Sequence, residues 1–377
     1  MQDDERRASK MNKKITDTLL LFSVLALLSL GVIMVYSTSS ISALKSYHDE
    51  YYFLKKELIY ATLGIVFLLI FARVPYQYLG KNAYFILALS FLGLVLVLTP
   101  GIGVCIGGAK RWIHFGPFSI QPAEFAKLGL IIYLSFFLYK KQMNLKKFST
   151  GFLPPLIITG IMSVLILVQP DFGTTFLLMA LFFVLLFVGG ARVLHLTLVV
   201  LVFGFAGVVL ILMSQYRIDR IFAFLDPWKD PMGRGFQIIQ SFIAFGTGGV
   251  FGQGLGNGKQ KLFYLPEAHT DFIFSVVGEE LGLTGVMMVI SLFLIVIYCG
   301  IKIALRSRDR FGTYLALGIF SFIGLQGIVN MGVVMGLLPT KGTTLPFVSY
   351  GGTSLIVNLI GIGILLNISS QSRAYER

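Results

Sequence analysis

Three ionisable side chains lie at alternate positions in the segment YLPEAHTDFIF, which joins two long apolar runs. They are Glu267, His269 and Asp271, and this spacing places all three on one side of the chain if the segment is extended. Histidine and carboxylates are metal ligands, whereas a single carboxylate can act as a general base. The neighbouring Glu267 and the low dielectric of a membrane surface both favour a protonated Asp271, which makes it a stronger base. Because the chain has only 4 histidines, the pattern favours a general base over a metal site.

A group of cations is predicted at the same end of the membrane-spanning runs as Asp271. Guanidinium groups match the geometry of phosphate oxygens, and lysine adds a compact positive charge. A carboxylate base beside several cations at membrane level indicates that the substrate is a lipid phosphate. The cations of this group are Lys110, Arg111, Arg217, Arg220, Arg234 and Lys341.

The segment AKRWIHFGPFSIQPAEFAKLG adds polar side chains that have structural alternatives to substrate binding. Gln121, Glu124 and Lys127 lie at the start of an apolar run, and the last two are spaced so that they can neutralise each other on one helix. Trp112 suits either the aromatic belt of a membrane interface or a substrate site. Asp171 follows a proline at a predicted helix start, and we interpret it as an N-terminal cap.

The elements that position these residues are long apolar runs. Of the 377 residues, 56% are hydrophobic. A soluble domain has about 45–50%, and about 20 apolar residues cross the hydrocarbon core of a membrane as a helix. The chain is therefore predicted to be an all-α polytopic membrane protein with about ten transmembrane helices. The expected spans are 16–37, 56–73, 81–100, 122–139, 152–168, 173–190, 193–214, 271–300, 311–337 and 345–368.

The net charge of +13 is explained by membrane topology. Cytoplasmic loops are rich in Lys and Arg, so the basic N-terminal tail is assigned to the cytoplasm, and an even number of spans places the C-terminus there too. Anionic membrane lipids attract such a basic face. No basic patch is interleaved with exposed aromatic residues, which argues against a nucleic-acid partner. The predicted organisation is a cytoplasmic tail at 1–14, a ten-helix membrane domain at 15–370 and a second cytoplasmic tail at 371–377.

One long loop, 215–270, is predicted on the extracytoplasmic side. Residues 236–245 have the pattern of a short amphipathic helix at the interface, and seven glycines follow it up to Gly258. A phosphate-binding P-loop is excluded, because the residues around Lys259 depart from its pattern at two positions. Close backbone packing or positive φ angles explain the glycines better.

Several motifs resemble those of the SEDS family (shape, elongation, division and sporulation proteins), which contains FtsW and RodA. The resemblance runs from about residue 15 to residue 370, and the TKG that includes Lys341 is more similar to FtsW than to RodA. Ala123 replaces a serine that is frequent in the family, while the glutamate and the lysine of the same motif are kept. The motifs are KRWIHFG, QPAEFAK, QPDFGTT, FLDPWKDPMGRGFQ, GVFGQGLGNGKQKLFYLPEAHTDFIFSVVGEELG and LPTKGTTLPFVSYGGTS.

The resemblance implies a ten-span peptidoglycan glycosyltransferase that polymerises lipid II at the outer face of the cytoplasmic (inner) membrane. Such proteins work with a class B penicillin-binding protein, which crosslinks the strands, and with other division proteins. Asp271 matches the family's essential aspartate and is the expected general base, positioned by Glu267 and His269. The implied reaction inverts the anomeric carbon and releases undecaprenyl pyrophosphate, stabilised by Arg111 and nearby cations, while Lys341 contacts a sugar or phosphate. No cofactor is implied, although a divalent cation (Mg²⁺ or Mn²⁺) is compatible with the leaving group.

Two other functions are compatible with this composition. A lipid II flippase would also need a groove for a lipid phosphate, but transporters usually have sites near the membrane midplane, on broken helices arranged in repeats. No internal repeat is evident, and the polar residues gather at the outer end, which favours surface chemistry. A non-catalytic scaffold of the division machinery has no need of Asp271. We therefore favour a glycosyltransferase of septal wall synthesis, with elongation and sporulation as the other roles open to it.

Overall fold

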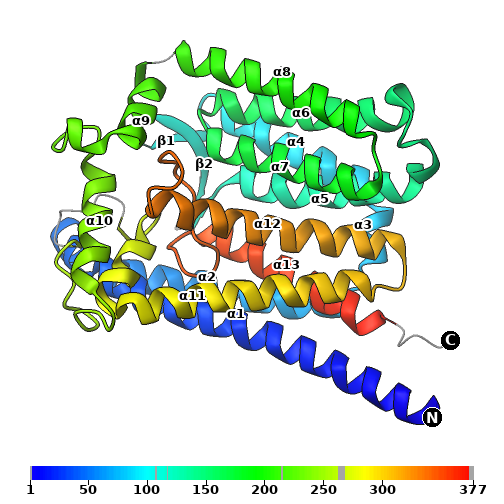
Figure 1. The fold of residues 1–377 in the computed structure, drawn as a ribbon, viewed down its shortest axis with the longest axis horizontal. Helices are drawn as coiled ribbons and strands as arrows, with labels where there is room; N and C mark the ends of the chain where they lie inside the picture. The colour runs from blue at the N-terminus through cyan, green and yellow to red at the C-terminus, as the bar shows by residue number, and fades with distance from the viewer. Residues whose placement is uncertain (1, 107, 117, 214, 262–267, 373–377) are drawn as a thin grey trace.

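The computed structural model describes residues 2–372 except 107, 117, 214 and 262–267, and these form a bundle of long helices (Figure 1). Each predicted span corresponds to one long helix, which confirms the polytopic helical fold. Eight of these helices are long and apolar enough to cross a membrane, α4 is a shorter apolar helix, and α2 has three charged residues near its start. The long helices are α1 (Gln2–Tyr47), α2 (Tyr52–Arg73), α4 (Ala83–Leu98), α5 (Pro122–Lys141), α6 (Leu153–Val168), α7 (Phe172–Gly189), α8 (Val193–Leu212), α11 (Ile273–Leu305), α12 (Arg310–Val334) and α13 (Gly352–Gln371).

Shorter elements fill the connections between the long helices. The amphipathic helix expected at 236–245 is present as α10, whereas α9 and a small antiparallel sheet, in the order β1-β2-β3, were not expected from the sequence. The two hairpins of this sheet turn at Gly108 and Gly116, which both adopt the positive φ angles that glycine allows. The short elements are α3 (Gln77–Lys81), β1 (Gly103–Ile106), β2 (Ala109–Phe115), β3 (Phe118–Ile120), η1 (Gln142–Asn144), η2 (Phe148–Phe152), α9 (Gln215–Leu225), η3 (Pro227–Lys229) and α10 (Phe236–Gly248).

The last long helix begins later than its hydropathy indicates. The predicted span starts at residue 345, but α13 begins only at Gly352. Pro346 lacks the N–H that a helix interior requires, and Phe347 has a φ of 66°, outside the helical region. Residues 340–351 are therefore irregular, and this 340–351 segment forms part of the candidate site.

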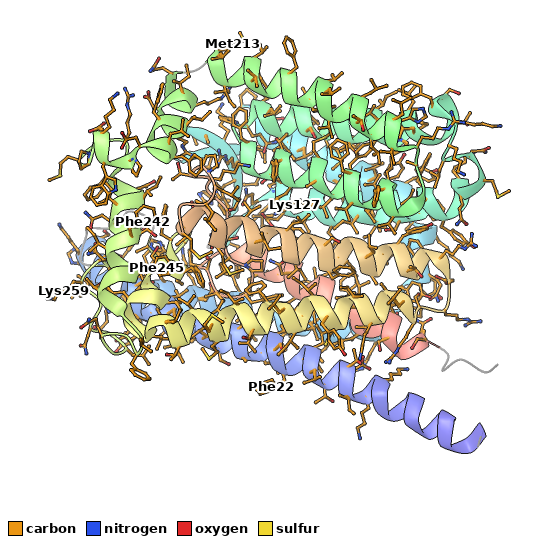
Figure 2. All side chains as sticks on the ribbon, in the orientation of Figure 1. Phe22, Lys127, Met213, Phe242, Phe245 and Lys259 are labelled. Atoms are coloured by element: carbon orange, nitrogen blue, oxygen red, sulfur yellow. The ribbon has the colours of Figure 1, made fainter. Side chains whose placement is uncertain are left out.

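The centre of the bundle is formed by α5, α12 and α13. In the most apolar stretch of each of these helices, between 72% and 89% of the residues are buried, compared with 11% in the corresponding stretch of α8. Lys127 lies within this centre (Figure 2). Glycines bring α2 and α13 into close contact. A methyl group added at Gly64 would lie 2.4 Å from the Leu359 side chain, and one added at Gly363 would lie 2.5 Å from the carbonyl oxygen of Leu68.

The helix α11 is interrupted at Gly282, where φ is 67° and the backbone is not helical. The glycine-rich segment 246–258 packs into this interruption, and the backbone N–H of Gly254 donates to the carbonyl oxygen of Glu280 at 3.0 Å. A methyl group added at Gly252 would lie only 2.1 Å from the same oxygen. The expectation that close backbone packing and positive φ angles explain these glycines is confirmed.

Two adjacent buried carboxylates hold the glycine-rich segment and α1 to α11. Glu280 forms an ion pair of 2.7 Å with Lys261 and accepts a hydrogen bond of 2.8 Å from the hydroxyl group of Ser37 on α1. Glu279 accepts a hydrogen bond of 2.7 Å from the backbone N–H of Lys259. The glycine-rich segment and Lys261 are therefore fixed to α11, the helix that follows Asp271.

Candidate functional site

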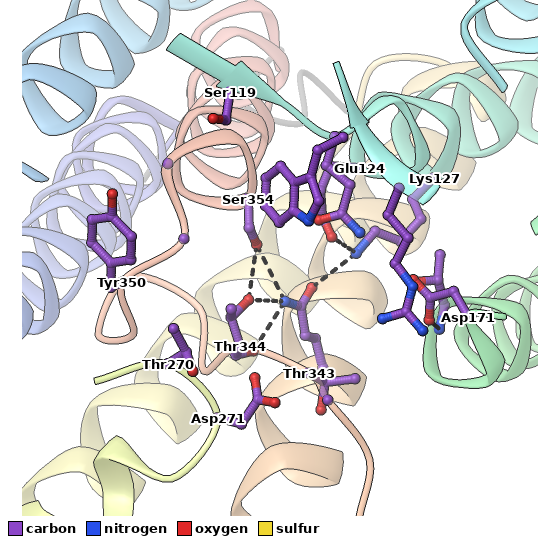
Figure 3. Close-up of a pocket in the computed structure, with 18 of the residues that line it drawn as sticks. Ser119, Glu124, Lys127, Asp171, Thr270, Asp271, Thr343, Thr344, Tyr350 and Ser354 are labelled. Carbon is purple, nitrogen blue, oxygen red and sulfur yellow. Dashed lines mark hydrogen bonds and ion pairs between the residues drawn. The ribbon is translucent and has the colours of Figure 1, made fainter. Parts of the chain in front are cut away.

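A cavity of about 360 Å³ lies between α2, the small sheet, α5, α7, α12 and the 340–351 segment (Figure 3). The small sheet, which forms part of its wall, is at the end of the bundle away from the N-terminal part of α1 and the C-terminal end of α13 (Figure 1). The predicted site residues that line the cavity come from β2, from the start of α5 and from the turn before α11. They are Arg111, Trp112, Gln121, Glu124, Lys127 and Asp271.

Asp271 lies in a turn at 268–272, directly before α11. A second cavity of about 90 Å³ borders the first, and both Asp271 and Gly342 line the two cavities. The side chain closely approaches the 340–351 segment, because a methyl group added at Gly342 would lie 3.1 Å from Asp271 Oδ2. The carboxylate is therefore at the junction of two cavities, within reach of a hydroxyl group of a ligand in either one.

Two of the predicted cations, Arg220 and Lys341, line the smaller cavity. Arg220 donates a hydrogen bond of 3.0 Å to the carbonyl oxygen of Thr340. The ammonium group of Lys341 lies 3.8 Å from the centre of the Phe176 ring, a cation–π contact. Burial lowers the pKa of Lys341 to about 8, and the negative charge of Asp171 opposes this shift. The smaller cavity thus presents one permanent and one titratable positive charge near the carboxylate of the predicted base.

Glu124 and Lys127 form an ion pair of 2.7 Å on α5, and both side chains are buried. Lys127 Nζ also donates to Gln326 Oε1 at 3.5 Å and lies 4.9 Å from the centre of the Phe322 ring. The sequence left an internal pair and a substrate role open; the structure contains the pair and also places both residues in the cavity wall. Within the described part of the chain, Glu124 Oε2 has no hydrogen-bond partner, so the pair leaves one carboxylate oxygen unused.

Arg111 and Asp171 belong to the wall of the larger cavity and are fixed by backbone contacts. Arg111 donates from Nε to the carbonyl oxygen of Gln169 at 3.0 Å and from a terminal nitrogen to that of Pro170. Asp171 is the N-terminal cap of α7, and its Oδ1 accepts a hydrogen bond of 3.0 Å from the backbone N–H of Thr174. The predicted cap is confirmed, and the turn that it begins also holds the guanidinium group.

Three of the predicted cations line neither cavity. Lys110 is exposed on β2. The guanidinium group of Arg217 lies 4.0 Å from the centre of the Phe172 ring, and Arg234 forms an ion pair of 3.0 Å with Asp219. The sequence placed these residues at the correct end of the bundle but could not show that other side chains engage two of them.

The extended segment suggested for Glu267, His269 and Asp271 is wrong for its described part, because residues 268–272 form a turn. The His269 ring packs against aromatic rings, with centroids 4.7 Å from Phe53 and 5.8 Å from Tyr350, and His269 is not among the residues that line the two cavities. Glu267 lies outside the described residues. This turn leads directly into α11, which begins at Ile273.

Two buried amides of α12 were not among the predicted site residues. Gln326 lines the larger cavity and donates to the carbonyl oxygen of Thr344 at 3.0 Å and to Ser354 Oγ at 3.3 Å (Figure 3). Asn330 donates to the carbonyl oxygen of Asp271 at 2.9 Å. The sequence signal that could have found them is a pair of amides four residues apart in one span, since buried polar groups in a membrane require partners.

The alternative of a metal site has no support from the described residues. Across the residues that the structure describes, no group of three or more His, Cys, Asp or Glu side chains could hold a metal ion. The arrangement that is present is a carboxylate between two cavities whose walls contain positive charges. Such a site can accept a proton from a hydroxyl group and stabilise an anionic group nearby.

Comparison with known proteins agrees with the motifs. The model of the FtsW/RodA/SpoVE family, described as cell cycle proteins, matches residues 17–374. The chain is 49% identical over 358 residues to a protein of Geobacter metallireducens named probable peptidoglycan glycosyltransferase FtsW, a match that covers 95% of each chain. It is 45% identical over 358 residues to the stage V sporulation protein E of Bacillus subtilis, which covers 95% of this chain and 98% of that one.

A solved structure has the same fold. It comes from work on the structural coordination of polymerization and crosslinking by a peptidoglycan synthase complex. The TM-score is 0.76 at 30% sequence identity, and the match covers 95% of this chain and 98% of the solved chain. The helical bundle, the motifs and these matches over nearly the whole length agree. The chain belongs to the FtsW/RodA/SpoVE family, the SEDS proteins.

Proposed function

We propose that this multi-pass membrane protein is a peptidoglycan glycosyltransferase that polymerises lipid II into glycan strands. The observation that supports this most directly is the position of Asp271, whose side chain lines two adjoining cavities with cations in their walls. A shared carboxylate suits a reaction that joins an acceptor and a donor chain, because the reacting end of each can approach it from one of the two cavities. The printed name of the relative from Geobacter metallireducens supports the same activity.

In the proposed mechanism Asp271 is the general base. Its carboxylate accepts the proton of the C4 hydroxyl group of the acceptor sugar. The oxygen of that hydroxyl group then attacks the anomeric carbon of the donor chain, and the bond from this carbon to the pyrophosphate breaks. Undecaprenyl pyrophosphate leaves with the electron pair. Because the donor linkage is α and the new bond is β, direct displacement inverts the anomeric carbon and needs no covalent enzyme intermediate.

The cations of the two walls stabilise the negative charge of the leaving group. Arg111 serves the larger cavity, while Arg220 and Lys341 serve the smaller one. Trp112 and Gln121 offer an aromatic face and an amide to the sugars and the peptide of lipid II. The three predicted cations outside both cavities have no direct part in this mechanism. A divalent cation remains compatible with the pyrophosphate, but the described residues form no three-ligand cluster, so no step is assigned to it.

The proposal includes a membrane orientation and partners. Both termini and the tails 1–14 and 371–377 face the cytoplasm, and the end of the bundle with the cavities faces outward. The partner is a class B penicillin-binding protein, because the similar solved chain comes from a complex of polymerization and crosslinking. Septal wall synthesis, with other division proteins, is the proposed role, and the name of the relative from Geobacter metallireducens supports it.

The test is lipid II polymerisation by the purified protein in complex with its penicillin-binding partner, whose crosslinking is blocked. Wild type is compared with Asp271→Asn and with a matched control, Asp226→Asn, at an exposed aspartate that lines neither cavity. We expect glycan strands from wild type and from the control, and none from Asp271→Asn. Normal strands from Asp271→Asn would show that the base is assigned wrongly.

A second outcome separates the enzyme from its alternatives. If no variant makes strands while the complex is folded and a control polymerase is active, glycosyl transfer is excluded. A lipid II flipping assay in liposomes then distinguishes a transporter, which moves lipid II across the bilayer, from a scaffold, which does not.

A further inference from the structure

Two amide side chains occupy one face of α12 among apolar residues. Gln326 and Asn330 are four residues apart, so they lie one helical turn from each other on the same side of the helix. Both are almost completely buried, with 2% and 1% of their surface exposed. Buried amides are costly unless they are hydrogen-bonded, and here the partners include Asp271, Thr343 and Thr344, which line the two cavities.

Asn330 joins two segments that are far apart in the sequence. Its Nδ2 donates to the carbonyl oxygen of Asp271 at 2.9 Å and to that of Thr343 at 2.5 Å. Two carbonyl oxygens need a donor between them, so the nitrogen of the amide must face them. One side chain thus ties the turn before α11 to the segment before α13.

The same two segments also meet at the carboxylate of the proposed base. Gly342, which precedes Thr343, has so little space above its Cα that an added methyl group would lie 3.1 Å from Asp271 Oδ2. The backbone of Asp271 is held by Asn330, and its side chain lies against Gly342. The amide of Asn330 therefore sets the distance between the carboxylate and the wall that the two cavities share.

Gln326 makes a similar connection to Thr344, the residue that follows Thr343 in the 340–351 segment. Its Nε2 donates to the carbonyl oxygen of Thr344 at 3.0 Å, while its Oε1 accepts from Lys127 Nζ at 3.5 Å. The helix α12 thereby holds adjacent residues 343 and 344 with two successive amides. Through Gln326 this arrangement also reaches the Glu124–Lys127 pair on the other wall of the larger cavity.

We propose that Asn330 is a positioning residue of the transfer reaction, which holds the carboxylate of Asp271 in line with the two cavities. This inference rests on the proposed glycosyltransferase function. Without the amide, the carbonyl oxygens of Asp271 and Thr343 lose their common donor, and the turn at Asp271 is no longer tied to the 340–351 segment. A misplacement of about 1 Å in a reacting group lowers a rate by roughly 10²-fold. The contacts that hold Arg111 in the wall of the larger cavity do not involve Asn330, so we expect the rate to fall while most of the binding of lipid II is retained.

The experiment compares Asn330→Leu with a matched control, Asn358→Leu. Leucine has nearly the shape of asparagine without its donors. Asn358 is equally buried in a neighbouring core helix, but within the described residues its amide makes a single hydrogen bond, of 3.3 Å to Ser354 of its own helix. Both variants are assayed in the complex with the penicillin-binding partner for kcat and KM on lipid II and for thermal midpoint. We expect kcat of Asn330→Leu to fall about 10–100-fold with KM within about 3-fold, and kcat of Asn358→Leu to stay within about 3-fold.

A second variant separates positioning from stability. In Asn330→His, the ring Nδ1 is the same number of bonds from the backbone as the amide nitrogen, and can donate a hydrogen bond there. The larger ring overpacks the site, so we expect this variant to be less stable than Asn330→Leu but more active. Activity that follows thermal stability across the variants would overturn the inference, as would equal kcat for Asn330→Leu and Asn358→Leu. A wild type that makes no strands would instead count against the proposed function itself.

Discussion

Lys261 and Glu280 form an ion pair of 2.7 Å whose side chains keep only 5% and 0% of their exposure. The lysine precedes the residues that lead to the turn at Asp271, and the glutamate is on α11. Breaking a buried pair by removing one partner leaves an uncompensated charge, which costs about 3–5 kcal/mol. We therefore expect Lys261→Met to lower the free energy of unfolding by this amount in detergent solution. An unfolding curve that coincides with that of wild type would show that the pair does not stabilise the fold.

Glu57 on α2 is a buried carboxyl group whose removal should not lower the free energy of unfolding, in contrast to the removal of Lys261. It is 1% exposed, and within the described part of the chain neither of its carboxyl oxygens has a hydrogen-bond partner. A buried polar group without a partner costs about 1–3 kcal/mol. Glu57→Met, which keeps a similar volume, should therefore leave the free energy of unfolding unchanged or raise it by up to about this amount. The same unfolding assay serves, and a loss of stability comparable to that of Lys261→Met would reveal a partner for Glu57.

Lys341 should give the activity an alkaline limit. Burial lowers its pKa to about 8, so the positive charge in the smaller cavity disappears as the pH rises through that value. Because kcat/KM reports the free enzyme, we expect it to fall above about pH 8 in wild type. Lys341→Arg keeps the charge at all these pH values and should move the fall to higher pH. A wild-type profile that stays flat to pH 10 would show that this charge is not used.

The same lysine has a predictable effect on stability. Its pKa is lower in the folded protein than the ordinary value of 10.5, so between about pH 8 and 10.5 the unfolded chain binds more protons. The free energy of unfolding should therefore rise with pH in that window relative to Lys341→Met, which lacks the group. Below about pH 8 the difference between the two proteins should be constant. Denaturant titrations of both proteins at several pH values measure it, and a free energy of unfolding of wild type that falls relative to that of Lys341→Met as the pH rises would contradict the burial of this ammonium group.

The polymerisation activity should be sensitive to the addition of a single methyl group at Gly342. In Gly342→Ala the new methyl group would lie 3.1 Å from Asp271 Oδ2, closer than an ordinary van der Waals contact, so the carboxylate must move. We expect kcat to fall about 10-fold or more, because small displacements of a reacting group are costly, while the thermal midpoint changes little. Gly204→Ala on α8 is the matched control, since an added methyl group there meets nothing within 4 Å. If both variants polymerise lipid II at the wild-type rate, the Asp271 carboxylate does not depend on this contact.

The sequence by itself determined the features of this protein that depend on neighbouring residues. Apolar runs were enough to predict the ten long helices, because the length needed to cross a membrane is a local property. The helix cap at Asp171 and the pair Glu124–Lys127 join residues three positions apart, so spacing was enough to suggest them. The motif around Asp271 indicated the family and the expected base.

Only the tertiary structure decided which distant residues meet. The interruption of α11 at Gly282, filled by the glycine-rich segment, depends on backbone contacts between two separate segments. Lys261 and Glu280 are 19 residues apart, and Asn330 is 59 residues from Asp271. Hydropathy assigns each polar side chain to a span or a loop, but the side of a helix that faces a partner depends on how whole helices pack. For that reason the sequence could name Asp271, whereas the junction of two cavities and the amides that hold it there were determined by the fold.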